Sequence, residues 1–115
     1  MTTAAEILGL NDLGTKSVHV KQWDRLVRVR ELDLEQGMIL FSKAAGDKVM
    51  LSGDDIARIV AWAVIDENGN RVFSDKDIPK LAHKNRDAMM HLYQEIMGLS
   101  GSVDDAEKNS KASRR

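Results

Sequence analysis

The segment SGDDIARIVAWAVI, residues 52–65, decides the fold. From Ile56 to Ile65 it is apolar on nearly every side of a helix, which is typical of a helix buried in a protein core. Ser52 carries the hydroxyl that an N-cap needs, and the aspartates after it place negative charge in the first helical turn. We therefore predict a central buried helix over 56–65, with Trp62 in the core.

A turn and a short helix are predicted after this segment. The run DENGN, residues 66–70, is a strong turn signal. Asp77 is a suitable N-cap and Pro79 is tolerated in a first helical turn, so we expect a helix over about 78–84. The apolar side chains of this stretch are expected to face the core: Val72, Phe73, Ile78, Leu81 and Ala82.

A closing helix is predicted over about 86–98, with Asn85 either breaking the previous helix or capping this one. Gly98 and Gly101 are expected to stop it. One stripe at helical spacing comprises Met89, Leu92, Ile96 and Leu99, and an adjacent stripe comprises Met90, Tyr93 and Met97.

Before the central segment, two runs alternate between apolar and polar residues, which predicts an antiparallel hairpin within about 17–32. Val18 and Val20 share one face of the first strand, residues 17–23. Val27 and Val29 do so in the second strand, residues 26–32. Two strands alone are marginally stable, so the hairpin must lean on helices or on another subunit.

Helices are predicted on both sides of this hairpin. Residues 2–10 favour a short helix or an arm, followed by a turn. Residues 33–45 favour a helix that Gly46 ends. Its apolar stripe comprises Leu34, Met38 and Phe41.

The predicted fold is mainly α with a small antiparallel β-hairpin near the N-terminus, an α+β arrangement in which helices dominate. At 115 residues the chain has the length of one domain. Its 43% hydrophobic and 30% charged residues are typical of a globular protein rather than a disordered one. We expect a single helical domain over 1–101 and a polar, disordered tail over 102–115.

Composition and motifs exclude several functions. A net charge of −1 argues against nucleic-acid binding, and no apolar run approaches a membrane span. The chain has no cysteine and no glycine-rich phosphate-binding motif. The three histidines lack metal-ligand spacing. We therefore expect no catalytic, cofactor or metal site, and a cytosolic protein that is not an enzyme.

Residues 66–77 have oxygen ligands at the first, third and fifth positions of an EF-hand-like loop. Arg71 stands where that loop needs its glycine, and Asp77 replaces the longer bidentate glutamate. A turn between helices is the better interpretation.

The methionine-rich closing helix is the best candidate for a binding surface. Methionine side chains are flexible and polarizable, and they are common at adaptable interfaces. The apolar surface also looks wider than a domain of this size can cover. The predicted contact residues are Met89, Met90, Tyr93 and Met97, with Trp23 as a possible addition. Core packing is the alternative role for each of them.

Three segments occur in an order that resembles the tail assembly chaperones of long, non-contractile-tailed phages and prophages. The first is Trp23 followed by the strand ending in VREL, residues 29–32. The second is an apolar helix leading into DENGNRVFSDKD, residues 66–77. The third is an amphipathic helix followed by a polar tail with EKNS, residues 107–110. The resemblance covers roughly residues 17–110.

This resemblance implies a protein that binds the aggregation-prone tape measure protein before the tail tube forms around it. It implies coating in many copies with self-association, action in the host cytoplasm, and absence from the mature virion. Members of the family often make a longer product by programmed ribosomal frameshifting, whose extension recruits the tail tube protein.

Two other classes remain open. A small structural virion protein, such as a head-tail connector or tail-completion subunit, would share the size and the lack of catalytic motifs. A helix-turn-helix DNA-binding regulator would have helices of this size, although the near-neutral charge weighs against it.

Overall fold

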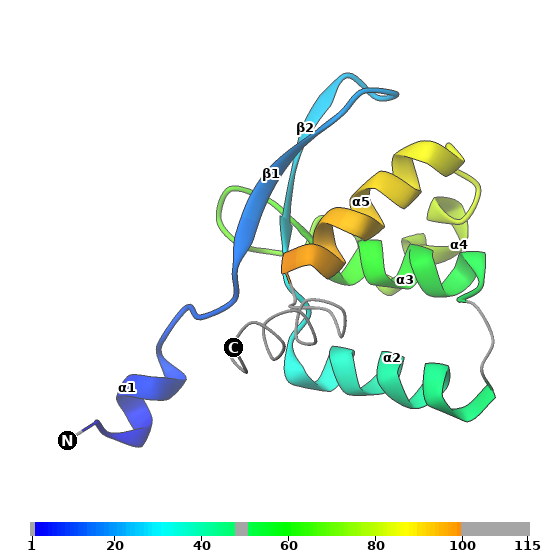
Figure 1. Ribbon diagram of the computed structural model, residues 1–115. Helices are drawn as coiled ribbons and strands as arrows, with labels where there is room; N and C mark the ends of the chain where they lie inside the picture. The colour runs from blue at the N-terminus through cyan, green and yellow to red at the C-terminus, as the bar shows by residue number, and fades with distance from the viewer. Residues whose placement is uncertain (1, 48–50, 100–115) are drawn as a thin grey trace, which may run out of the picture.

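The structure is a computed structural model that describes residues 2–47 and 51–99, with side chains described for 2–40 and 51–99. Figure 1 shows a long β-hairpin beside a group of helices, with a short N-terminal helix standing apart. The elements follow in this order: α1 (Ala4–Leu8), β1 (Thr15–Val20), β2 (Arg25–Arg30), α2 (Leu34–Asp47), α3 (Gly53–Ala63), β3 (Val64–Ile65), the 3₁₀ helix η1 (Asp75–Asp77), α4 (Ile78–Leu81) and α5 (Arg86–Leu99).

The predicted hairpin is confirmed, with both strands starting one or two residues earlier than expected. β1 and β2 pair in antiparallel register, with Val18 opposite Val27. Val18, Val20 and Val29 are buried, and Val27 is half-buried against the core. The alternating pattern therefore gives the sheet one core-facing side, as the period of a strand requires.

A third strand makes the sheet larger than predicted. β3 pairs with β2 in antiparallel fashion, with Val64 opposite Val29, so the strand order is β1-β2-β3. The prediction of a helix through Ile65 is wrong at its C-terminal end. Val64 has extended backbone angles while its N–H still donates to the Val60 carbonyl. Two consecutive β-branched residues favour this change from helix to strand.

The start of α3 agrees with the prediction. The Ser52 hydroxyl accepts a hydrogen bond from the Asp55 N–H at 3.2 Å, and the Asp55 carboxylate accepts one from the Ser52 N–H at 3.0 Å. This reciprocal capping box satisfies two N–H groups that the first turn leaves unpaired. Trp62 is half-buried, at the margin of the core rather than inside it.

The core lies between α3, α5 and the inner face of the sheet. α5 contacts α3 as well as β1 and β2, and Figure 1 shows it running between them. Leu92 and Ile96 of α5 are fully buried, together with Ile59 of α3. An ion pair between Lys16 and Glu95 joins β1 to α5 at the surface.

The two short elements before α5 differ from the predicted helix over 78–84. α4 is a single turn that ends at Leu81, and the Asp77 side chain does not cap it. Asp77 instead accepts a hydrogen bond from the Ser74 N–H at 2.9 Å and so holds η1. The capping role of Asn85 is confirmed, because its side-chain oxygen accepts from the Ala88 N–H at 3.0 Å.

α1 and α2 lie at the periphery. The predicted stop at Gly46 is wrong, because α2 continues to Asp47. Leu40 of α2 packs against the core, whereas Leu34 and Met38 are 82% and 53% exposed. The predicted tail, residues 102–115, lies outside the described residues.

Candidate protein-binding surface

The predicted contact residues of α5 divide between the core and the surface. Met89 is only 6% exposed and belongs to the core, so it is not available to a partner on this fold. Met90, Tyr93 and Met97 are half-buried and form one flank of the helix. Because α5 packs against both α3 and the sheet, most of its wide apolar sector is used for packing. Binding through the remaining flank stays a prediction.

Trp23 lies in the turn between β1 and β2, where its backbone N–H donates to the Val20 carbonyl at 3.1 Å. Its ring is half-buried and packs against the core. The next residue, Asp24, has a left-handed backbone with φ of 49°, which lets the chain reverse there. An indole in this position can serve packing and an interface at once.

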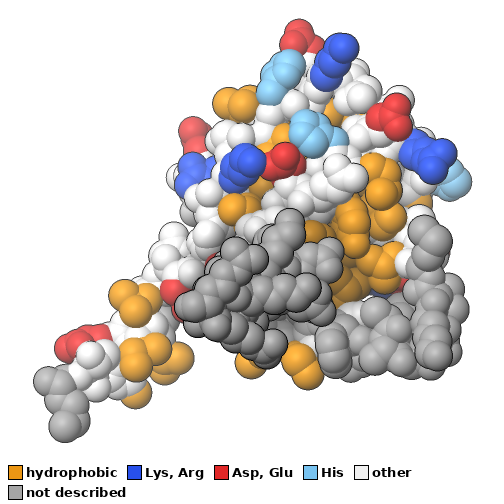
Figure 2. Space-filling model, in the orientation of Figure 1, with side chains coloured by type: hydrophobic (Ala, Val, Ile, Leu, Met, Phe, Trp, Pro, Cys, Tyr) orange, Lys and Arg blue, Asp and Glu red, His pale blue; other side chains and the backbone are white. Residues whose placement is uncertain are grey.

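The sequence prediction missed a second apolar surface, which lies on α1 and α2. No residue of α1 is buried, and Ile7 and Leu8 are 55% and 84% exposed. In Figure 2 hydrophobic side chains cover the projecting arm, gather over α5 and appear again along the lower side of the molecule. The helical spacing of Ala4, Ile7 and Leu8 is the sequence signal that could have identified the arm as an apolar face.

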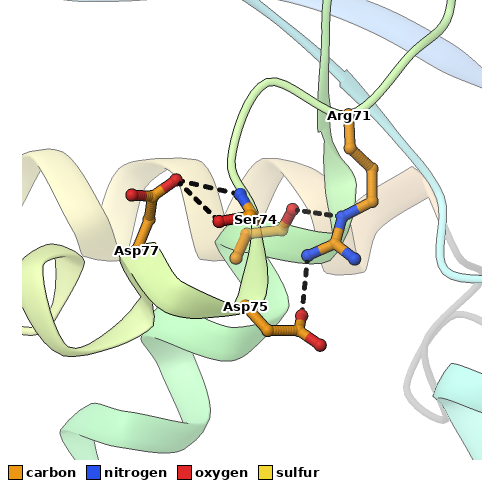
Figure 3. A network of polar contacts seen from close by, with 5 residues as sticks. Arg71, Ser74, Asp75 and Asp77 are labelled. Atoms are coloured by element: carbon orange, nitrogen blue, oxygen red, sulfur yellow. Dashed lines mark hydrogen bonds and ion pairs between the residues drawn. The ribbon is translucent and has the colours of Figure 1, made fainter.

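An open groove of about 340 Å³ lies between α3 and the η1–α4 segment. Two of its charged side chains, Asp75 and Arg58, have partners of opposite charge. Asp75 binds the Arg71 guanidinium at 3.0 Å (Figure 3). Arg58 lies 3.8 Å from Asp55. The groove is lined by Asp54, Arg58, Trp62, Asp75, Ile78 and Pro79.

Arg71 has a structural role beside this groove. Its Nε donates to the Ala61 carbonyl at 3.1 Å, and its Nη2 donates to Asp75 (Figure 3). Carbonyls in the last turn of a helix lack helical partners, and a cation there also interacts favourably with the helix dipole. Arg71 therefore fastens the loop before η1 to the end of α3.

Arg30 places a second guanidinium near the end of β2. Burial lowers the pKa of Arg30, Asp33 opposes that change, and the positive charge of Arg71 adds to it. Arginine nevertheless stays protonated in proteins. The Arg30 Nη1 donates to the Glu31 carbonyl at 2.7 Å, which holds the charge against the backbone.

In the loop that resembles an EF-hand, the first carboxylate accepts hydrogen bonds from backbone N–H groups. Oδ1 of Asp66 accepts hydrogen bonds from the N–H groups of Asn68 and Asn70, at 2.8 and 3.0 Å. Gly69 supplies the positive φ of 86° that this turn requires. Within residues 2–47 and 51–99, no three acidic or histidine side chains are grouped as metal ligands would be. Over the same ranges, no helix has the length and apolarity needed to cross a membrane.

Comparison with solved structures identifies a close match in fold. A structure titled "Structure of bacteriophage HK97 tail assembly chaperone" superposes with a TM-score of 0.63. The chain has the fold of a phage tail assembly chaperone. The match covers 82% of this chain and 88% of the HK97 protein, at 15% sequence identity. No protein-family model matches the sequence, and no curated protein matches it.

Proposed function

We propose that this chain is a tail assembly chaperone that binds the tape measure protein and keeps it soluble while the tail tube assembles. The observation that carries the proposal is the fold shared with the HK97 tail assembly chaperone over most of both chains. The order of the three segments within residues 17–110, which resembles the same family, also supports the proposal. The proposed role is non-enzymatic.

The flank formed by Met90, Tyr93 and Met97 is the proposed contact with the tape measure protein. All three side chains are half-buried and so leave apolar surface for a partner, and Tyr93 and Met97 pack against the core. An amphipathic helix can lay its apolar face against such a surface. Methionine adapts its shape to successive stretches of a varied helix.

Coating in many copies would follow from weak contacts of this kind. Each copy would cover a short stretch of the long partner, and neighbouring copies would add to one another through multivalency. Weak single contacts also allow the coat to be removed when tube subunits arrive. We further propose action in the host cytoplasm, absence from the mature virion, and recruitment of the tail tube protein through a longer frameshifted product.

The direct test is co-expression with a tagged tape measure protein, followed by a solubility assay and a pull-down. We expect the tape measure protein to stay soluble and this chain to co-purify with it. If the tape measure protein stays insoluble and nothing co-purifies, the proposal is wrong. Mass spectrometry of purified particles then tests the alternative, since a head-tail connector or tail-completion subunit stays in the virion.

Variants of α5 locate the contact. Changing Met90 and Met97 to Glu should leave a folded protein that no longer co-purifies with the tape measure protein, because two charges would enter the apolar contact. Leu26→Glu with Val72→Glu is the matched control, since both residues are apolar, more than half exposed and not part of α5. If circular dichroism shows that the α5 variant unfolds, these residues are part of the core. If the control loses binding equally, the contact lies elsewhere.

A further inference from the structure

The side of the sheet opposite to the buried valines carries three arginines. In the pairing register, Arg28 of β2 lies directly opposite Ile65 of β3, and Arg71 pairs with the other edge of Ile65. Residues that pair directly project from the same side of a sheet. Arg30 comes two residues after Arg28 in β2 and therefore shares that side. Arg28, Arg30 and Arg71 together form the arginine face.

Ile65 lies beneath this arginine face. It is only 5% exposed, yet it does not belong to the core cluster that includes its neighbour Val64. An arginine can cover apolar surface with its methylene stem while its charged head stays in water. Arg28 and Arg71, on either side of Ile65, are exposed as whole residues. Their guanidinium groups are therefore available to an anionic partner.

The positive charge of the arginine face is only partly balanced. Arg71 pairs with Asp75 at 3.0 Å. Burial lowers the pKa of Arg30, Asp33 raises it, and the nearby positive charge of Arg71 lowers it again. Among the residues whose side chains the structure describes, no carboxylate forms an ion pair with Arg28. Guanidinium groups bind carboxylates strongly and often in bidentate fashion, so this face suits an acidic segment.

The segment that follows α5 has the charge and the position to occupy this face. Residues 104–107 read DDAE, which is three carboxylates in four residues, and they lie outside the described part of the chain. α5 ends at Leu99, and a Cβ added at Gly14 would lie 3.9 Å from the Leu99 Cδ2. The residue after Gly14, Thr15, pairs directly with Arg30. The chain therefore leaves α5 beside the end of the hairpin where the arginine face begins.

The length of the connection also fits. Five residues separate Leu99 from residue 104 and span about 17 Å when extended. The distance from β1 across β2 to β3 is two strand spacings, or roughly 10 Å. The acidic residues can therefore pass around the edge of β1 and reach the arginine face.

We propose that residues 104–107 dock on the arginine face of the same chain, with their carboxylates on Arg28 and Arg30. A segment on so short a tether has an effective concentration in the millimolar range, which favours it over a free acidic partner. The contact holds the start of the polar tail on the side of the sheet opposite to α5. It thereby keeps the tail away from the proposed binding flank on α5. Its test uses this chain alone, so its failure would leave the binding of the tape measure protein untouched.

Cross-linking within one chain tests the contact, because the natural chain has no cysteine. Ser17 pairs directly with Arg28 and so lies on the arginine face, and Val103 precedes the acidic residues. A variant with Ser17→Cys and Val103→Cys keeps every charge of the proposed contact. Under mild oxidation at low protein concentration, we expect its intramolecular disulfide to form readily, because docking raises the effective concentration of the two thiols.

The matched control adds Asp104→Asn, Asp105→Asn and Glu107→Gln to the same two cysteines, which leaves the tether length unchanged. We expect the disulfide to form about tenfold or more slowly in this control at low salt, because the electrostatic contact is lost. In about 1 M salt the two rates should converge, since salt screens exposed charges. Acidic neighbours disfavour the thiolate form of a cysteine and by themselves would slow the reaction, so a faster rate with the acids present reports docking. Equal rates at low salt, or a difference that salt does not change, would overturn the proposal.

A second comparison tests which arginines take part. Arg28→Gln in the double-cysteine chain should slow the disulfide, because it removes a guanidinium from the arginine face. Arg25→Gln is the matched control from the same strand, since Arg25 pairs with the buried Val20 and therefore projects from the opposite side of the sheet. It should leave the rate unchanged. Both arginines are exposed, so both variants should fold, which circular dichroism checks. Equal effects of the two substitutions would contradict docking on the arginine face.

Discussion

α5, on the one hand, and α1 and α2, on the other, have similar fractions of apolar residues, yet these residues differ in how far other elements cover them. α5 contacts α3, β1 and β2, so its wide stripe of methionine, leucine and isoleucine is mostly covered. α1 and α2 leave Ile7, Leu8, Leu34 and Met38 more than half exposed. The comparison teaches that the width of an apolar stripe does not identify a binding surface. What decides is how many neighbouring elements pack around the helix.

The largest expected effect is a difference in the free energy of unfolding between two leucine-to-alanine variants, one in α5 and one in α2. Leu92→Ala in α5 should lower the free energy of unfolding by about 3 kcal/mol, because it removes a fully buried side chain and leaves a cavity. Leu34→Ala in α2 should lower it by less than about 0.5 kcal/mol, since that side chain is 82% exposed. Urea denaturation of the two variants measures both. Similar losses would mean that α2 is covered as completely as α5.

A smaller difference in the free energy of unfolding is expected between variants of the two capping boxes, at Ser52 and at Thr3. Ser52→Ala should lower the free energy of unfolding by about 1 kcal/mol, because it removes the cap of a helix in the core. Thr3→Ala removes the same kind of cap from α1. It should leave the free energy of unfolding of the monomer unchanged, because no residue of α1 is buried there. Thermal denaturation at low protein concentration distinguishes them, and an equal loss from Thr3→Ala would show that α1 packs on its own body.

The smallest predicted effect is a gain in α2. A Cβ added at Gly37 meets no atom within 4 Å. Gly37→Ala should therefore stabilise the helix by roughly 0.5 kcal/mol, because alanine loses less backbone entropy than glycine. Slower amide hydrogen exchange in α2 is the expected readout. Unchanged or faster exchange would mean that Gly37 is needed for a contact of α2.

Local patterns predicted much of this fold. The period-2 valines of residues 18–29 placed the hairpin and its buried face, and the Ser52 cap placed the start of α3. The helical spacing of Leu92 and Ile96 grouped them on one stripe of α5, and the structure buries both. Each of these features is decided by residues close together in the sequence, so the local pattern is enough to predict it.

The errors arose where contacts between distant segments decide the outcome. Val64 leaves the helix and pairs with Val29, a residue far away in the sequence, so the local pattern around Val64 does not show this pairing. Met89 could not be separated from Met90 without knowing that α5 is packed by both α3 and the sheet. The exposed faces of α1 and α2 were missed for the same reason, since periodicity shows an apolar stripe but not whether another element covers it.

The central claim, that many copies coat the tape measure protein, is tested most directly by native mass spectrometry of complexes with tape measure fragments of two lengths. The number of chains bound should rise in proportion to fragment length, because each copy covers a short stretch. The same small number of chains on both fragments, or no complex with either, would contradict it.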